Sequence, residues 1–323
     1  MQRKIIATGL SLLSFTFQFK ALAKNYDEIV VFGDSFSDTG NVFSATKEAI
    51  PPSSSYFNGR FSNGSIWVEY LASDLGINFN PKTNFAYGGA TTGFENIGVE
   101  SLPGLQQQIN SFTSVNQSAD PNSLYIVWAG TNDYLDYFFG GSPNPNQTVT
   151  NLIDAVKALA AVGAKDIIVV NQPNLGNFPV TGGSNQTASI LNTYTSEHNS
   201  QLSANLNFLN QELSSDINII SLDVDSLYNR IIATPEEFGF TNVTDSCIGE
   251  LSVVPINISE QPVTCTPDEF LFWDQVHPTT ATHKLIAELA FSVLKVASVP
   301  EPSTVLGLIV VGTLSTVGFL KNK

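Results

Sequence analysis

Three residue types that together perform nucleophilic catalysis occur at separate points of this 323-residue chain. Ser35 follows a glycine and an aspartate, and Asp274 precedes His277 by three residues in a short stretch that ends in proline. A serine hydroxyl attacks a carbonyl effectively only if a base takes its proton, and a carboxylate beside that base fixes its tautomer. The other histidines, His198 and His283, have the surroundings of helix surfaces. His277 is therefore the candidate base, with Asp274 bending back towards it.

Acyl transfer also needs hydrogen-bond donors for the charge that develops on the carbonyl oxygen, and two segments offer them. Segment 84–90 contains Gly88 and Gly89, whose backbone N–H groups a substrate can approach closely because no side chain intervenes. In segment 130–133, Asn132 places an amide side chain soon after an apolar run. Glycine pairs usually mark turns and Asn-Asp is common in loops, so neither segment is decisive alone.

The elements that must position these residues follow from the alternation of short apolar runs with longer helical patterns. Strands are expected at residues 28–32, 123–129, 166–171 and 217–222, and helices at residues 66–75, 149–162, 188–213 and 280–296. Such alternation is typical of a parallel sheet with helices on both faces, in which ligands bind where the strands end. The candidate residues follow predicted strands, so we expect them to meet at one edge of the sheet.

Serine, glycine, asparagine and histidine in this chain order resemble the four sequence blocks of the GDSL or SGNH hydrolases. The likeness spans residues 29–296 and extends to residues 67–72 and 272–274. It implies a three-layer α/β/α fold with a central, mostly parallel five-stranded sheet of the flavodoxin-like kind. It also implies that the chain hydrolyses carboxylic esters through an acyl-enzyme, without a metal or organic cofactor.

The same resemblance assigns a role to each matching residue. In the second block, Gly89 is preferred over Gly88 as the oxyanion donor, and Gly88 stays open as the alternative. The implied site residues are the catalytic Ser35, Asp274 and His277, the oxyanion donors Ser35, Gly89 and Asn132, and the supporting Asp34 and Asp133.

The first 23 residues have the composition of an export signal. Arg3 and Lys4 precede an apolar run, and the small-residue triplet at 21–23 follows it, which is typical of a secretory signal peptide cleaved after Ala23. Because Lys20 interrupts this pattern, an uncleaved anchor is the alternative.

The last residues, 299–323, combine a Pro-Glu-Pro triplet, an apolar stretch near the shortest length that spans a bilayer, and terminal lysines. This order resembles the PEP-CTERM sorting tail of Gram-negative bacteria, whose triplet an exosortase recognises. An ordinary C-terminal anchor or a glycosylphosphatidylinositol signal is the alternative. Residues 24–298 then form one hydrolase domain, exported to the cell envelope or beyond and transiently anchored in the inner membrane by its tail.

The charge of the chain limits its partners. The 29 acidic and 14 basic residues give a net charge of −15, and residues 24–299 alone carry −19 because five basic residues and one acidic residue lie outside them. Such a surface disfavours nucleic acid and anionic membranes. Cys247 and Cys265 would be oxidised in an exported protein and are expected to form one disulfide. The expected partners are a small-molecule or glycan ester and the sorting enzyme, and the chain is expected to be a monomer.

Two other functions fit parts of the sequence. A metal phosphoesterase would use Asp34, Asp38 and Asp133, but such sites usually need a closely spaced Asp-x-His, which does not occur here. A glycan-binding or matrix protein on the same fold would have no reason to keep every catalytic residue type. For an esterase, the acidic surface and sorting tail favour a neutral acyl ester such as an acetylated glycan, with aryl and long-chain lipid esters open. The aromatic residues at 134 and 137–139 are expected either to line the acyl site or to belong to the core.

Overall fold

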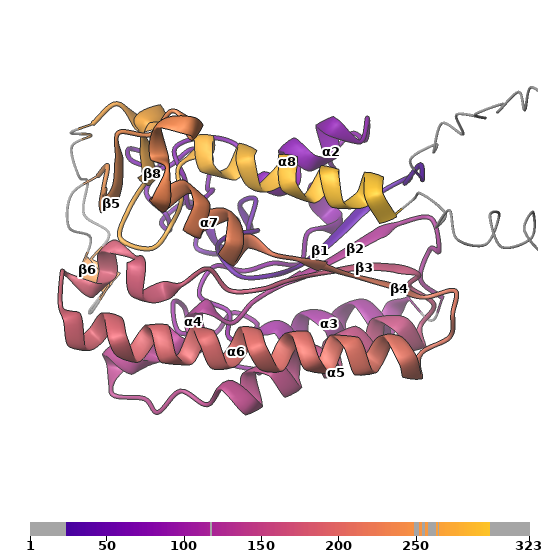
Figure 1. Cartoon of the computed structure of the whole chain (residues 1–323). Helices are drawn as coiled ribbons and strands as arrows, with labels where there is room; N and C mark the ends of the chain where they lie inside the picture. The colour runs from indigo at the N-terminus through magenta and orange to yellow at the C-terminus, as the bar shows by residue number, and fades with distance from the viewer. Residues whose placement is uncertain are drawn as a thin grey trace, which may run out of the picture.

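Four short apolar segments form the central sheet (Figure 1). They are β1 (Ile29–Gly33), β2 (Leu124–Trp128), β3 (Asp166–Val170) and β4 (Asn218–Leu222), which pair in parallel in that order. Every residue of β1, β2 and β3 is buried, and strands covered on both faces are built from such largely apolar runs. The structure is a computed structural model that describes residues 24–116, 118–248, 252–253, 256–257, 263 and 265–297.

Helices cover both faces of the sheet and complete a three-layer α/β/α domain (Figure 1). One face carries α2 (Trp67–Asp74), α7 (Val224–Ala233) and α8 (Thr280–Ala297), and the other carries α3 (Leu105–Val115), α5 (Pro145–Ala161) and α6 (Asn185–Glu212). The short helices α1 (Asn41–Ala45) and α4 (Thr131–Leu135) come soon after β1 and β2. The predicted α/β fold class is confirmed.

The predicted strand count is wrong, because the described part of the sheet has four strands rather than five. The fifth position, beside β1, is occupied by segment 84–87, which makes a single parallel bridge between Asn84 and Val31. Its backbone still follows β1, with Phe85 N–H donating to the Val31 carbonyl at 2.7 Å and Tyr87 N–H to the Gly33 carbonyl at 3.1 Å. The next bridge of a regular ladder is missing because the Gly33 N–H, which would donate to the Phe85 carbonyl, donates to Gln108 Oε1 instead. With this segment counted, the strand order is that of flavodoxin-like sheets.

Shorter elements connect these layers. The strand β5 (Asn242–Ser246) pairs in parallel with β8 (Phe270–Phe272), and β6 (Ser252–Val253) pairs antiparallel with β7 (Ile256–Asn257). Single turns of 3₁₀-helix lie at η1 (Pro81–Thr83), η2 (Asp136–Phe139), η3 (Leu175–Asn177), η4 (Pro179–Thr181), η5 (Pro235–Phe238) and η6 (Pro267–Glu269). Cys247, directly after β5, forms the predicted disulfide with Cys265.

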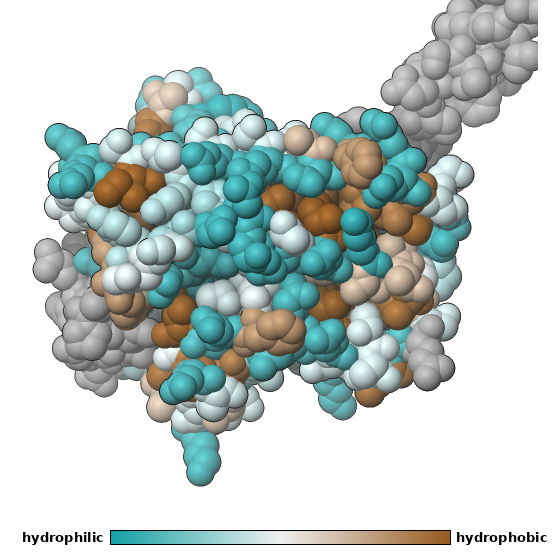
Figure 2. Space-filling model, turned by 90° about the horizontal axis from the view of Figure 1, so that it is seen from below, coloured by the Kyte–Doolittle hydropathy of each residue, from teal (hydrophilic) through white to brown (hydrophobic). Residues whose placement is uncertain are grey.

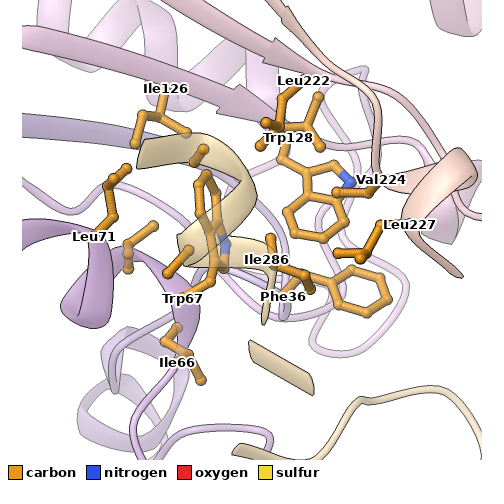
Figure 3. Packing of buried hydrophobic residues seen from close by; sticks show 14 of the residues in the cluster. Phe36, Ile66, Trp67, Leu71, Ile126, Trp128, Leu222, Val224, Leu227 and Ile286 are labelled. Carbon is orange, nitrogen blue, oxygen red and sulfur yellow. The ribbon is translucent and has the colours of Figure 1, made fainter. Parts of the chain in front are cut away.

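Side chains alternate across the sheet and divide the core into two layers. Val31 and Ile126 point towards the α2, α7 and α8 side, whereas Val30 and Val127 point towards α3, α5 and α6. On the first side, the aromatic ring of Phe36, in the turn that follows β1, packs with the rings of Trp67 and Trp128 (Figure 3). Phe36 stacks on Trp128 with ring centroids 4.9 Å apart, and the edge-on Trp67–Trp128 pair is 5.6 Å apart. This packing fixes the residues on either side of the turn.

The opposite, α3–α5–α6 face is mostly hydrophilic at its surface, with apolar side chains in small separate groups (Figure 2). In the described part of the chain, no helix is both long enough and apolar enough to cross a bilayer. The predicted signal peptide at 1–23 and sorting tail at 299–323 lie outside the described residues. The described chain begins and ends on the side of the sheet where the strands start (Figure 1), and Lys24 pairs there with Asp166 at the start of β3.

Candidate active site

The turn that carries Ser35 is held by backbone contacts that only glycine permits. Gly33 ends β1 with φ +151°, and a Cβ atom there would overlap the Trp128 carbonyl oxygen. Gln108 of α3 binds the same glycine twice: the Gly33 N–H donates to Oε1, and Nε2 donates to the Gly33 carbonyl, each at 2.9 Å. Asp34 N–H donates to the Trp128 carbonyl at 3.3 Å. Ser35 therefore leaves the sheet in one fixed direction.

The three predicted catalytic residues are joined by hydrogen bonds. The Ser35 Oγ lies 2.8 Å from His277 Nε2, and His277 Nδ1 lies 2.7 Å from Asp274 Oδ2. Asp274 Oδ1 accepts from the backbone N–H groups of Val276 and His277 at 2.8 and 2.7 Å. Ser35 and Asp274 are only 7% and 3% exposed. In this arrangement the imidazole accepts the serine proton on one nitrogen while the carboxylate holds the other.

The two candidate glycines differ in what their N–H groups do. Gly88 N–H donates to Asp38 Oδ2 at 2.9 Å, so it is already used. Gly89 N–H has no partner among the described residues. The Gly88 carbonyl accepts from Asn96 Nδ2 at 2.9 Å, and because this carbonyl and the Gly89 N–H point in opposite directions from one planar peptide, the N–H is aimed away from Asn96. Ile97 N–H holds the Gly89 carbonyl at 2.8 Å. This geometry favours Gly89 as the donor.

Asn132, in the first turn of α4, lies beside the glycine segment. One hydrogen of its Nδ2 group donates to the Ala90 carbonyl at 2.9 Å, which leaves the second hydrogen for a ligand. The neighbouring Asp133 accepts from the Thr92 N–H at 2.8 Å, from the Thr92 hydroxyl at 2.5 Å and from the Thr148 hydroxyl at 3.2 Å. The second and third blocks are thus bound directly to each other.

The two supporting carboxyl groups have perturbed acidities. Burial raises the pKa of Asp34 to about 7, partly offset by a hydrogen bond from Phe36 N–H and by the charge of His277. Burial likewise raises the pKa of Asp133 to about 6 against the donors on Thr92 and Thr148. For Asp274, burial acts in the same direction, but the charge and hydrogen bonds of His277 outweigh it and hold its pKa below the usual value. The site therefore keeps Asp274 ionised near neutral pH.

The prediction that His198 and His283 lie on helix surfaces is wrong. They belong to α6 and α8 as expected, but they are 0% and 1% exposed. Burial lowers the pKa of each to about 3. His198 Nδ1 lies 2.7 Å from the hydroxyl of Tyr134. Tyr134 is buried and belongs to the core, whereas Phe139, the last of the aromatic residues at 134 and 137–139, is 42% exposed.

Sequence reasoning missed Tyr56, whose hydroxyl donates to Asp274 Oδ2 at 2.7 Å across 218 positions of sequence. No local pattern could have linked these residues. It also missed Gln108 and Asn96, which hold Gly33 and Gly88. For Asp38 a signal was present, because an Asp-Thr-Gly-Asn stretch is typical of a helix start. Asp38 indeed accepts the Asn41 N–H at 2.6 Å as well as that of Gly88.

Comparison with known proteins gives a consistent assignment. Residues 29–290 match the family described as GDSL-like Lipase/Acylhydrolase. The chain is 30% identical over 273 residues to a thermolabile hemolysin of Vibrio parahaemolyticus, covering 81% of this chain and 62% of that protein. It is 27% identical over 323 residues to a phosphatidylcholine-sterol acyltransferase of Aeromonas hydrophila, covering 87% of this chain and 94% of that protein.

Among solved structures, the carbohydrate acetylesterase Est24 of Sinorhizobium meliloti superposes with a TM-score of 0.48 at 16% identity, covering 84% of this chain and 99% of that one. An aryl esterase of M. smegmatis gives a TM-score of 0.47 at 16% identity, with 82% and 97% covered. The family assignment rests on the sequence match over most of the domain and not on these superpositions. The chain belongs to the GDSL-like lipase/acylhydrolase family.

Proposed function

We propose that this chain is an exported serine esterase that hydrolyses neutral carboxylic esters through an acyl-enzyme on Ser35. The observation that carries the proposal is the continuous hydrogen-bonded path from Ser35 Oγ through His277 to Asp274, with distances of 2.8 and 2.7 Å. A path of this kind lets the imidazole take a proton without movement of the backbone.

In the acylation step, Ser35 Oγ bonds to the ester carbonyl carbon while its proton passes to His277 Nε2. The negative charge on the carbonyl oxygen is received by the N–H groups of Ser35 and Gly89 and by the free Nδ2 hydrogen of Asn132. Collapse of the tetrahedral intermediate formed in this way breaks the carbon–oxygen bond to the alcohol, and the alcohol leaves with the proton held by His277. Asp274 stays ionised throughout and stabilises the imidazolium.

Deacylation reverses these proton transfers. Water gives a proton to His277 Nε2 as its oxygen bonds to the acyl carbon, and the second intermediate collapses to release the carboxylic acid and restore Ser35. An alcohol in place of water would complete an acyl transfer. The name of the Aeromonas relative, which this chain matches over 94% of that protein, makes such a transfer worth measuring alongside hydrolysis.

For the substrate, we propose a neutral acyl ester. The net charge of −15 disfavours anionic substrates. The sequence relatives named as a hemolysin and a phosphatidylcholine-sterol acyltransferase favour a lipid acyl ester, while the acetylated glycan expected from the sorting tail is the alternative.

The decisive experiment measures hydrolysis of p-nitrophenyl esters from acetyl to palmitoyl by the purified protein and by its Ser35→Ala and His277→Ala variants. We expect both substitutions to lower kcat by more than about 10³-fold, because the base and nucleophile act as a unit. The chain-length optimum separates an acetylesterase from a lipase. Esterase activity that survives Ser35→Ala but disappears with a chelator would replace this proposal with a metal-dependent one. Tight glycan binding without turnover would favour the binding protein.

We further propose that residues 1–23 are a signal peptide, that 24–298 are the hydrolase domain, and that 299–323 are a sorting tail that anchors it until an exosortase-type enzyme acts. The arrangement of the domain supports this, because the described chain begins and ends at the amino edge of the sheet (Figure 1), whereas Ser35 follows the carboxyl end of β1. The site would then face away from the membrane. Cell fractionation that finds a full-length cytoplasmic protein would refute both terminal assignments.

A further inference from the structure

The loop at residues 51–65 contacts the loop that carries Asp274 and His277 along much of its length. Trp273 Nε1 donates to the Ser55 carbonyl at 3.1 Å, and the Ser62 hydroxyl donates to the Pro278 carbonyl at 2.9 Å. Asn63 Oδ1 accepts from Thr280 N–H at 2.8 Å. These bonds fix the backbone of the catalytic loop on both sides of its acid and base.

One contact between these loops reaches the catalytic carboxylate itself. The Tyr56 hydroxyl donates to Asp274 Oδ2 at 2.7 Å, and the same oxygen accepts His277 Nδ1–H at 2.7 Å. Tyr56 is 5% exposed and packs in a small apolar cluster with Cys247, Ile248 and Trp273. Its hydroxyl is therefore held against the carboxylate and shielded from water.

We propose that Tyr56 is a positioning residue of the triad, whose hydroxyl holds the Asp274 carboxylate in one orientation and moderates its pull on the His277 imidazole. This inference rests on the proposed function. With Oδ1 bound to two backbone N–H groups and Oδ2 to Tyr56 and His277, the carboxylate has four donors in all. A carboxylate oxygen shared between two donors gives less negative charge to each, so His277 meets a weaker partner than it would without Tyr56.

The other groups that act on the imidazole do not replace this contact. Asp34, in the nucleophile turn, acts on His277 through charge without a hydrogen bond, and His283, on α8, is neutral near pH 7 because burial lowers its pKa to about 3. Phe36 and Phe61 lie near its ring at centroid distances of 5.9 and 5.1 Å. Among the described residues, Tyr56 is the one side chain other than His277 that hydrogen-bonds to Asp274.

The test compares Tyr56→Phe with Ser62→Ala in the full chain. The first removes only the hydroxyl that reaches Asp274, and the second removes a hydroxyl that joins the same two loops at the Pro278 carbonyl. We expect Tyr56→Phe to lower kcat about tenfold with KM unchanged, as loss of an orienting partner does at other sites. The acid limb of its kcat/KM profile should move about half a unit to higher pH, because the uncompensated carboxylate favours the protonated imidazole. Ser62→Ala should leave that limb in place.

Two further measurements keep the test informative if Tyr56→Phe folds poorly or the ester substrates are not turned over. Replacing Tyr56 by fluorotyrosine keeps its shape and makes the hydroxyl a stronger donor, so the acid limb should move to lower pH. The low-field proton resonance of His277 Nδ1–H needs no turnover and should shift in Tyr56→Phe. An unmoved resonance and limb, or an equal shift in Ser62→Ala, would overturn the proposal. Absence of Ser35-dependent esterase activity in the wild type would instead refute the proposed function.

Discussion

Replacement of Asn96 by aspartate tests whether Gly89 is the backbone donor of the oxyanion site. Asn96 is 5% exposed, and its Oδ1 accepts from Gly98 and Val99 N–H at 2.9 and 2.8 Å. Aspartate keeps the oxygen that accepts from these two N–H groups but puts a second oxygen where Nδ2 now donates to the Gly88 carbonyl at 2.9 Å. Two acceptor oxygens repel at that distance. The peptide between Gly88 and Gly89 should therefore rotate and carry the Gly89 N–H out of line.

The size of the effect follows from what still holds that peptide. Complete loss of one oxyanion donor lowers kcat by about 10²-fold to 10³-fold. Because Ile97 N–H continues to hold the Gly89 carbonyl at 2.8 Å, the rotation is restrained, and we expect kcat to fall between about tenfold and 10²-fold with little change in KM. A protonated carboxyl would restore the lost donor. The deficit relative to wild type should therefore shrink at acidic pH.

The assay is steady-state hydrolysis of the best p-nitrophenyl ester at several pH values, with Thr91→Val as the matched control. The Thr91 hydroxyl donates to the Glu95 carbonyl at 2.8 Å in the same loop but does not touch the glycine pair. If Asn96→Asp kept the wild-type kcat, or if Thr91→Val lost as much, the orientation of Gly89 by Asn96 would be refuted. A rise in KM alone would point to substrate binding instead.

Three other perturbations have expected outcomes of known direction. Asp274→Asn should lower kcat by about 10³-fold to 10⁴-fold. The new amide NH₂ must face either the backbone N–H groups or His277 Nδ1–H, and in both orientations two hydrogen-bond donors face each other. Retention of a tenth of the activity would contradict this prediction. Asp34 binds its proton more tightly in the native state, where its pKa is about 7, than in the unfolded state, where it is 3.8. Ionisation of Asp34 therefore lowers the free energy of unfolding as pH rises from about 4 to 7, by up to roughly 4 kcal/mol. Asp34→Asn should accordingly raise the melting temperature more near pH 8 than near pH 5, and an equal change at both would refute this. Reduction of the Cys247–Cys265 disulfide should lower the free energy of unfolding by about 3 kcal/mol, because the bond closes an 18-residue separation; equal urea midpoints with and without reductant would exclude this effect.

The strands and most long helices could be predicted because their apolar patterns are local. The central strands are short runs that match the predicted ranges to within two residues at each end. Helix α3 was missed although Leu105, Ile109 and Phe112 have helical spacing, because Gln108 interrupts its buried face. That glutamine is buried for a reason the sequence does not contain, namely the backbone of Gly33. The missing fifth strand has the same origin, because Gln108 accepts the Gly33 N–H that would otherwise donate to the Phe85 carbonyl.

That the candidate catalytic residues meet could be predicted for a different reason: each lies in a short motif whose residue types have few other combined uses. The side chains that hold these residues in place could not be predicted. Tyr56 and Gln108 act on residues 218 and 75 positions away, and their local surroundings are ordinary. The exposure of His198 and His283 was misjudged because their polarity outweighed their spacing: His198 lies on one helix face with Leu202 and Leu206, and His283 lies on one face with Ile286, Ala287 and Ala290.

The hydrogen bonds that hold this site follow one pattern, in which the partners come from distant parts of the sequence. Each segment of the candidate site is bound by a side chain from another segment: Gly33 by Gln108, the Gly88 N–H by Asp38, the Ala90 carbonyl by Asn132, and Asp274 by Tyr56. Loops at the carboxyl ends of parallel strands have no ladder partners of their own, so their backbone groups must be satisfied in this way. The same bonds that satisfy buried polar groups therefore set the direction of the candidate nucleophile, the candidate base and the proposed oxyanion donors. Folding of the domain therefore also preorganises the site. Single substitutions among these supporting side chains should lower kcat while the domain stays folded.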